Sequence, residues 1–303
     1  MGIRFLHTSD WQLGMTRHFF SDGAQERYTQ ARFDAIRTMG CIAKEEKCQF
    51  MLVCGDTFES NQVDRKTVAR ALEALKDVAV PVYILPGNHD PLNAASVYYS
   101  RTFIDRKPAH VHVIENSTPI KVMDDVEIVG APWLSKRPAA NPVDELLTDY
   151  TVSSHVIRIC MGHGGVDQFT PDRDAPGIIS VEALERAIGA GKFQFIALGD
   201  RHSLTQIGST NRIWYSGTPE STDFPEIKSG YAQVVEVSHE QVSTKEIQVG
   251  QWSFHEINCT EINNNEDITA LIKTLESFER KDLTVIRINI AGCLSLSLLG
   301  ILE

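Results

Sequence analysis

The chain has 303 residues, of which 42% are hydrophobic, enough to bury a large core and to form one large domain with a smaller appendage. Its formal net charge of -11 excludes a protein that coats nucleic acid by bulk electrostatics, because that mode of binding needs an excess of Lys and Arg. The longest apolar run, residues 293–302, is far shorter than the roughly 20 residues that span a bilayer. The sequence therefore indicates no membrane partner.

Neither export nor disulfide bonding is indicated. Arg4 and Asp10 interrupt the N-terminal segment where a secretory signal would be continuously apolar. The six cysteines are scattered and form no C-x-x-C pair, and several lie inside apolar runs as small hydrophobic residues do. We therefore expect a cytoplasmic localisation.

Apolar runs alternate with amphipathic helical stretches up to about residue 200. This alternation is typical of βα units with buried, largely parallel strands, and it predicts an α/β fold. A helix is predicted over residues 24–47, and a second one over the apolar positions Val63, Val68, Leu72 and Leu75. Buried strands are predicted over residues 3–6, 50–54, 80–85, 156–161 and 193–198.

Shorter strands follow and are interpreted as hairpins that finish a sheet. They are predicted over residues 126–129, 212–215, 231–237 and 244–249, between turn-forming clusters. The composition shifts near Gly250, after which residues 253–258 predict a strand, 266–280 a helix and 283–290 a strand. We therefore expect a domain over residues 1–250 and a small βαβ unit over residues 251–303.

Each of the five buried strands is followed by a cluster of possible metal ligands. A single Asp at such a place more often caps a turn or a helix, but five clusters in register with five strands favour one shared metal site. In α/β sheets the carboxyl ends of the strands form the ligand crevice, where these side chains would meet. The clusters contain Asp10 and Gln12, Asp56 and Glu59, Asn88, His89 and Asp90, His163, and Asp200 and His202.

The ligand types narrow the chemistry. Carboxylates, amides and imidazoles together suit hard or borderline divalent ions, and two such ions can clamp a phosphoryl group. The sequence contains no G-x-S-x-G elbow, no P-loop and no G-x-G-x-x-G motif. These absences exclude nucleotide hydrolysis by a P-loop route and give no support to a serine nucleophile.

The order of these motifs resembles the calcineurin-like metallophosphoesterases. Within them, H-T-S-D-W-Q-L-G near the start and Y-S-G-T-P-E-S-T-D-F at residues 215–224 resemble the SbcD-type DNA repair nucleases, which are exonuclease subunits of double-strand-break processing complexes. The resemblance spans roughly residues 3–237. It implies a calcineurin-like phosphoesterase β-sandwich flanked by helices, followed by an incomplete C-terminal βαβ capping domain.

The same resemblance implies a role for each candidate residue. Asp56 would bridge two divalent ions, and a hydroxide between these ions would attack the phosphodiester. His89 would act on the scissile phosphate as a catalytic residue, oriented by Asp90. One ion would be held by Asp10, Gln12, Asp56 and His202, and the other by Asp56, Asn88, His163 and Asp200.

Two positions depart from the family pattern. Gln12 and Asp200 stand where histidines are usual, so the ligand set contains more oxygen and less imidazole. This favours Mn²⁺, or Mg²⁺, over Zn²⁺. The alternative interpretation is a weakened site, although both residues can still bind a metal.

The sequence thus predicts a metal-dependent DNA nuclease, with two alternatives. One is a small-molecule phosphodiesterase or nucleotidase, and the other is a non-catalytic subunit that binds DNA or an ATPase. The resemblance further implies an SbcC-type coiled-coil ATPase as partner and a homodimer. Because the chain stops inside an apolar segment at Glu303, we expect it to be truncated.

Several other side chains are weaker candidates. His7 is expected to pack inside the protein, on the strand face opposite Leu6, and Trp133 to fill the core. Five basic residues could guide a phosphate backbone or could simply be solvated: Arg17, Lys136, Arg137, Arg201 and Arg212.

Overall fold

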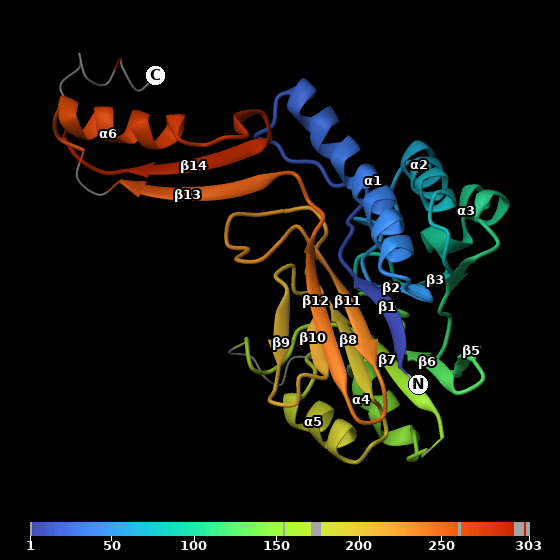
Figure 1. The fold of residues 1–303 in the computed structure, drawn as a ribbon. Coiled ribbons are helices and arrows are strands. Elements are labelled where there is room, and N and C mark those ends of the chain that lie inside the picture. Colours follow the sequence, from blue (N-terminus) through green and yellow to red (C-terminus); the bar gives the residue numbers. More distant parts are fainter. Residues whose placement is uncertain (1, 154, 171–176, 260–261, 294–299, 301–303) are drawn as a thin grey trace.

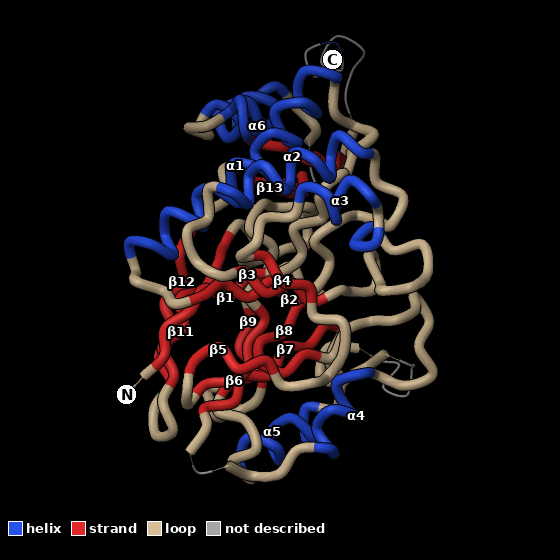
Figure 2. Tube along the Cα trace, turned by 90° about the vertical axis from the view of Figure 1, so that its right-hand side faces the viewer, coloured by secondary structure: helices blue, strands red, loops and turns tan. Residues whose placement is uncertain are grey.

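Two six-stranded sheets pack face to face, with helices on both outer faces (Figures 1 and 2). This arrangement is seen in a computed structural model, which describes residues 2–153, 155–170, 177–259, 262–293 and 300. The predicted α/β sandwich flanked by helices is confirmed. No helix in the described part of the chain is long and apolar enough to cross a membrane.

The first sheet contains four parallel strands extended by an antiparallel hairpin. Strands β1 (Ile3–Thr8), β2 (Phe50–Cys54), β3 (Val82–Leu85) and β4 (Val111–Val113) run parallel. Strands β11 (Tyr231–Val237) and β12 (Val242–Gln248) complete the sheet in the order β12-β11-β1-β2-β3-β4. β1 and β2 are buried along nearly their whole length, as expected for strands covered on both faces.

The second sheet has the order β5-β6-β7-β8-β10-β9. Its strands are β5 (Ile120–Met123), β6 (Val126–Gly130), β7 (Ile157–His163), β8 (Phe195–Gly199), β9 (Thr205–Ile207) and β10 (Ile213–Tyr215). The interpretation of residues 126–129 and 212–215 as hairpin strands that merely finish a sheet is incomplete. β6 and β10 each pair antiparallel with an edge strand, but they also pair in parallel with β7 and β8.

Helices cover each sheet on its outer face. Over the first sheet lie α1 (Asp22–Glu45), α2 (Arg65–Lys76), η1 (Val97–Tyr99) and α3 (Arg101–Arg106), and over the second lie α4 (Pro142–Asp149) and α5 (Val181–Gly189). A third apolar core fills the space between the sheets. There Phe5 stacks on Phe50 with ring centroids 5.2 Å apart and meets the edge of Phe195 at 5.6 Å.

A small βαβ unit projects from this body (Figure 1). It contains β13 (Ser253–Cys259), α6 (Asn265–Glu276), η2 (Lys281–Leu283) and β14 (Thr284–Ile290), with β13 and β14 parallel. The buried Glu220 carboxylate accepts hydrogen bonds from the backbone N–H groups of Gln251 and Trp252, which ties the unit to the body. The domain division at residue 250 remains a prediction. The predicted truncation concerns residues 294–303, which apart from residue 300 lie outside the described residues.

His7 is buried between the sheets, on the same face of β1 as Phe5 and opposite Leu6, as the strand alternation predicts. Its Nε2 lies 3.2 Å from the carbonyl oxygen of Leu198, and its ring meets the edge of Phe195. Burial in these apolar surroundings lowers the pKa of His7 to about 4. The imidazole is therefore neutral in the folded protein at neutral pH.

This burial predicts a loss of stability in mild acid. The unfolded chain protonates His7 near pH 6.5 and the folded chain only near pH 4, so its stabilising contribution is complete above pH 6.5 and falls as the pH drops toward 4. Between about pH 7.5 and about pH 5 the free energy of unfolding should fall by about 2 kcal/mol from this source. Denaturant unfolding at both pH values measures the loss, which should be smaller in His7→Gln. The exposed His239→Gln is the control, and an equal acid loss in His7→Gln and the wild type would contradict the assignment.

Candidate metal centre

The loops after β1 and β2 run side by side beyond the ends of the strands. The N–H of Asp10 donates to the carbonyl of Gly55 at 3.0 Å, and the N–H of Gln12 donates to the carbonyl of Asp56 at 2.9 Å. The ladder between the two strands therefore continues into the loops. It holds Asp10, Gln12 and Asp56 next to one another at one end of the sheet.

The backbone at these positions is held in an unfavourable conformation. Six non-glycine residues in the described part of the chain have positive φ, and four of them are predicted ligands. A non-glycine residue in this region is uncommon, and such residues tend to cluster at functional sites. These four are Asp10 (53°), Gln12 (43°), Asp56 (52°) and Asp200 (103°).

The two sheets approach each other closely at the same end. A Cβ on Gly199, at the end of β8, would lie 1.8 Å from the carbonyl oxygen of Cys54. A Cβ on Gly55, where φ is +92°, would lie 2.0 Å from Nδ1 of His163. Glycine is therefore required at both places. This contact brings the ends of β7 and β8 against the end of β2.

His163 joins the two sheets and presents one free nitrogen to the site. Its Nδ1 lies 2.8 Å from the Cys54 carbonyl oxygen, which can only accept, so Nδ1 carries the proton. The lone pair of Nε2 then faces Asn88 Oδ1 at 2.8 Å, Asp56 Oδ2 at 3.4 Å and Asp200 Oδ1 at 3.8 Å. Three oxygens and a nitrogen lone pair repel one another unless a proton or a metal ion lies between them.

The second histidine is oriented by a carboxylate. His202 Nδ1 lies 2.8 Å from Glu226 Oε1 and 2.7 Å from Thr222 Oγ1, so its Nε2 faces Gln12, whose Nε2 is 3.0 Å away. The amide oxygen of Gln12 is buried without a hydrogen-bond partner among the described residues. A histidine held by a carboxylate and an unpartnered amide oxygen both suit a metal site.

Glu226 did not emerge from the sequence. It lies two residues beyond the Y-S-G-T-P-E-S-T-D-F motif and 24 residues from His202, a spacing that matches no local pattern. The available signal was one acidic residue just beyond the motif, followed two residues later by Lys228. Burial by itself would lower the pKa of His202, but the hydrogen bond to Glu226 and the negative charges of Asp10 and Glu226 together raise it.

The buried carboxylates complete the site. Donor atoms of Asp10, Asp56 and His163 all lie within 4.8 Å of one another, a spread that one ion with bonds of about 2.0–2.4 Å can span. Burial raises the pKa values of Asp10 and Asp200, and the Asp56 carboxylate adds to both shifts. The donor set thus fits divalent cations, which would relieve this concentration of negative charge.

His89 and Asp90 are placed differently from expectation. His89 Nδ1 lies 2.9 Å from the carbonyl oxygen of Glu59, and Nε2 lies 4.0 Å from Asp56 Oδ2 in a half-exposed side chain. The expectation that Asp90 orients the His89 ring is wrong, because the ring is held by the Glu59 carbonyl group. Asp90 instead accepts hydrogen bonds from Gly87 N, Phe58 N and the hydroxyl of Tyr98. Burial, with the Asp56 carboxylate, raises the pKa of Asp90 to about 6.

The basic candidates fall into three groups. Arg17 and Arg212 bond to backbone carbonyls, including those of Thr222 and Gln194, and so have structural roles. Arg201 lines a cavity of about 430 Å³ beside Asp200 and His202, with its guanidinium 4.1 Å from the Phe169 ring centroid. Lys136 and Arg137 are exposed. Trp133 is buried as predicted and donates to the carbonyl of His163 at 2.8 Å.

An α/β sandwich with carboxylates, amides and imidazoles at the strand ends defines a metal-dependent phosphoesterase. Residues 3–204, more than half of the chain, match the calcineurin-like phosphoesterase family, and the chain belongs to that family. This confirms the family predicted from the motifs. Membership implies a phosphoester hydrolase that uses divalent metal ions.

Three relatives are similar to the chain over a longer stretch than the family match covers. It is 22% identical over 292 residues to the DNA double-strand break repair protein Mre11 of Sulfurisphaera tokodaii, covering 92% of this chain and 71% of that protein. It is 24% identical over 279 residues to the SbcD subunit of the Escherichia coli nuclease SbcCD, covering 80% and 67%. The SbcD subunit of the Bacillus subtilis nuclease SbcCD is 24% identical over 274 residues, covering 78% and 66%.

A solved structure supports the fold alone. GAP50, described as the anchor in the inner membrane complex of Plasmodium, superposes with a TM-score of 0.52 at 13% identity. The superposition covers 82% of this chain and 85% of that one.

The crowding of carboxylates predicts that divalent ions stabilise the protein. At a free Mn²⁺ concentration of about 100 times the dissociation constant, the wild type should gain about 2.7 kcal/mol of unfolding free energy. Asp56→Asn should gain much less, because Asp56 is one of the three residues whose donor atoms lie within 4.8 Å of one another. Thermal unfolding with and without Mn²⁺ measures this, and the exposed Asp105→Asn serves as the control. Equal gains for Asp56→Asn and wild type would contradict the assignment.

The three hydrogen bonds to Asp90 predict a second effect. In Asp90→Asn one carboxylate oxygen becomes an NH₂ group, so a buried backbone N–H, of Phe58 or of Gly87, loses its acceptor. The free energy of unfolding should fall by about 1–3 kcal/mol. Denaturant unfolding measures the loss, with Tyr98→Phe as a comparison that leaves both backbone bonds intact. A loss no larger than in Tyr98→Phe would show that the backbone bonds contribute little.

Proposed function

We propose that the chain is a metal-dependent DNA nuclease that hydrolyses phosphodiester bonds, of the exonuclease type that processes double-strand breaks. The proposal rests on two groups of donor atoms. Oxygen atoms of Asn88, Asp56 and Asp200 converge on Nε2 of His163, and the side-chain amide of Gln12 lies beside Nε2 of His202. Relatives named as a double-strand break repair protein and as nuclease subunits support DNA as the substrate.

The ligand assignment is the one that the family resemblance implies, and the orientation of His163 and His202 supports it. Asp56 would be shared by both ions, because its carboxylate lies among the donors of both groups. We favour Mn²⁺, with Mg²⁺ as the second choice, because Gln12 and Asp200 supply oxygen where an imidazole would favour Zn²⁺. One ion would be held by Asp10, Gln12, Asp56 and His202, and the other by Asp56, Asn88, His163 and Asp200. When bound, the two ions would neutralise phosphate charge and supply a nucleophile at neutral pH.

His89 is the proposed catalytic residue. Since Glu59 holds Nδ1, the Nε2 atom stands free at the edge of the site, close to Asp56. Because the Glu59 carbonyl can only accept, Nδ1 carries a proton, and Nε2 carries one as well only in the doubly protonated ring. In that form Nε2 can donate a hydrogen bond to a phosphate oxygen or a proton to the departing sugar oxygen. Asp90 acts as a positioning residue, because it holds the backbone of Gly87, just before Asn88 and His89, against Phe58 and Tyr98.

The proposed partners follow from the relatives. We propose DNA as substrate, an SbcC-type coiled-coil ATPase as partner and a homodimer as the working unit, since two relatives are the SbcD subunits of SbcCD nucleases. The chain covers about two thirds of their length. A small-molecule phosphodiesterase and a non-catalytic subunit remain the alternatives.

The central test is Mn²⁺-dependent hydrolysis of DNA by the purified chain. His89→Gln should lower kcat by about 10²- to 10⁴-fold with little change in Mn²⁺ binding, because only a proton-donating group is removed. Asp56→Asn should abolish activity together with metal binding. The exposed residues His239 and Asp105 provide matched controls as His239→Gln and Asp105→Asn, which should keep full activity.

The choice of substrate separates the alternatives. Rates are compared on linear DNA, on bis(p-nitrophenyl) phosphate and on a nucleoside monophosphate. Hydrolysis of the small substrates without cleavage of DNA would favour the phosphodiesterase or nucleotidase. Failure to bind metal and to cleave any substrate would favour the non-catalytic subunit.

A further inference from the structure

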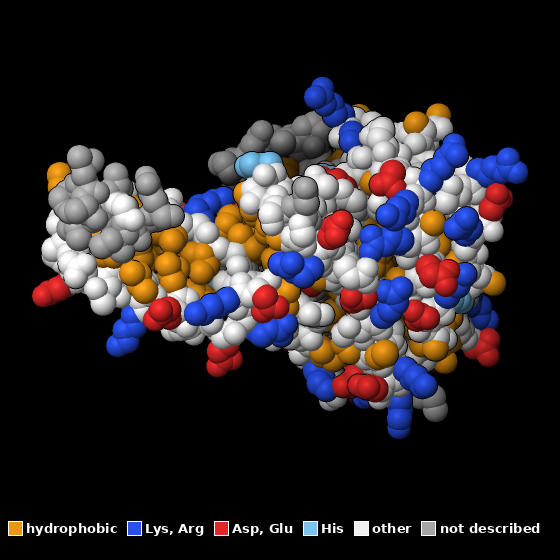
Figure 3. All heavy atoms as spheres, turned by 90° about the horizontal axis from the view of Figure 1, so that it is seen from above, with side chains coloured by type: hydrophobic (Ala, Val, Ile, Leu, Met, Phe, Trp, Pro, Cys, Tyr) orange, Lys and Arg blue, Asp and Glu red, His pale blue; other side chains and the backbone are white. Residues whose placement is uncertain are grey.

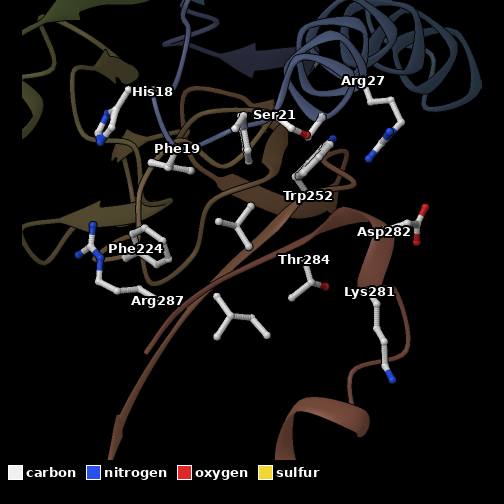
Figure 4. Close-up of a pocket in the computed structure, with 14 residues that line it drawn as sticks. His18, Phe19, Ser21, Arg27, Phe224, Trp252, Lys281, Asp282, Thr284 and Arg287 are labelled. Atoms are coloured by element: carbon white, nitrogen blue, oxygen red, sulfur yellow. The ribbon is translucent and has the colours of Figure 1, made fainter. Parts of the chain in front are cut away.

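A second cleft lies outside the metal centre, between the body and the projecting βαβ unit. It has a volume of about 720 Å³, within the range of pockets that hold ligands. The segment before α1, the first turns of α1, Phe224, Trp252 and strand β14 line it (Figure 4). Seen from above, hydrophobic side chains come to the surface on the βαβ unit and where it meets the body (Figure 3). We call this space the aromatic cleft.

Aromatic side chains make one wall of the aromatic cleft, and they fall into two classes. Trp252 lines the cleft but is buried, and it packs against Tyr28 in the apolar cluster that joins the βαβ unit to the body. Phe19 is 43% exposed, although its ring lies 6.2 Å from that of Phe224. The Phe19 ring also meets the rings of Phe20 and Phe254, with centroids 4.9 Å and 6.5 Å away, and its exposed part offers a surface to a ligand.

Positive charge surrounds this aromatic wall. Arg27, Lys281 and Arg287 line the cleft with a single acid, Asp282, although the whole chain has a net charge of -11. The guanidinium carbon of Arg287 lies 3.9 Å from the Phe224 ring centroid. Arg27 and Lys281 lie on the other side of the cleft from Phe19 and Phe224 (Figure 4). The local reversal of charge favours an anionic occupant.

The aromatic cleft lies next to the metal centre, across the short segment of residues 222–226. Phe224 lies between Thr222 and Glu226, which both hydrogen-bond to Nδ1 of His202. Two residues of extended chain span at most about 7 Å, so the Phe224 backbone is that close to each of them. The side chain of Arg17 bonds to the Thr222 carbonyl and ties the segment bearing Phe19 to the same loop. A strand reaching the metal centre could therefore continue into the cleft.

We propose that the aromatic cleft binds an unpaired nucleotide of the DNA strand that reaches the metal centre. The base stacks on the exposed ring of Phe19, and Arg27, Lys281 and Arg287 attract the flanking phosphates. Aromatic faces beside cations are characteristic of single-strand binding, because the faces of bases inside a duplex are already stacked. An apolar peptide fits less well, since it offers no partner to three cations. This inference deepens the proposed function and rests on DNA being the substrate.

The test is equilibrium binding of fluorescent DNA hairpins to the purified chain without divalent ions. One hairpin is blunt and the other carries a single-stranded tail. The wild type should bind the tailed hairpin more tightly. Phe19→Ala should weaken that binding by about tenfold and leave the blunt hairpin within about twofold, because one base loses its stacking partner. Phe19→Tyr should restore the affinity. Arg287→Ala should weaken tailed binding less at high salt than at low salt.

Matched controls exclude a general effect of surface changes. Tyr99→Ala removes another exposed aromatic ring, at 48% exposure, and should change neither hairpin's affinity. An equal loss on both hairpins for Phe19→Ala, no loss on either, or no preference of the wild type for the tail would overturn the proposal.

A second measurement separates this inference from the proposed function. Phe19→Ala should hydrolyse bis(p-nitrophenyl) phosphate at the wild-type rate with Mn²⁺, because the small diester does not reach the aromatic cleft. If the wild type cleaves DNA but Phe19→Ala keeps full affinity for the tail, only the cleft assignment fails. If the wild type cleaves no DNA and shows no preference for the tail, both proposals fail.

Discussion

The hydrogen bond between His163 Nδ1 and the Cys54 carbonyl is the contact on which the candidate site depends. It crosses from the second sheet to the first, at the point where Gly199 lets the two sheets approach. By fixing the proton on Nδ1, it also turns the Nε2 lone pair toward three oxygen atoms. This contact therefore fixes which ring nitrogen faces the pocket, while Gly199 and the apolar core between the sheets determine how closely the sheets approach.

The rest of the fold holds the carboxylates of the pocket together despite their electrostatic repulsion. Buried carboxylates face one another, and several ligands sit on a left-handed backbone. Both features cost stability, so they persist only where the surrounding structure enforces them. The three apolar cores and the continued ladder between the first two loops provide that enforcement. Metal ions would offset the electrostatic part of the cost.

The attachment of the βαβ unit likewise combines buried contacts with an open surface beside them. Its attachment uses buried aromatic rings and the Glu220 carboxylate, which satisfies two backbone N–H groups at the start of the unit. The joint leaves an open, basic cleft one short loop away from His202. The body and the projecting unit thus form adjacent walls of one surface, on which chemistry and strand recognition could be combined.

The sequence alone determined the five buried strands, the two helices that follow the first two of them and the family, because long apolar runs ending in polar clusters are local signals. It did not indicate α3, α4 or α5, which are short. The sequence also indicated the candidate metal ligands, and the fold brings these side chains together. Only the tertiary structure decided that these ligands come from two facing sheets, that Glu226 holds His202, and that the Glu59 carbonyl rather than Asp90 holds His89. Those contacts join segments between 24 and more than 100 residues apart. Every residue has a backbone carbonyl group, so residue identity does not indicate which carbonyl accepts a hydrogen bond from a distant side chain. Their geometry follows from how the sheets pack, which no local pattern encodes.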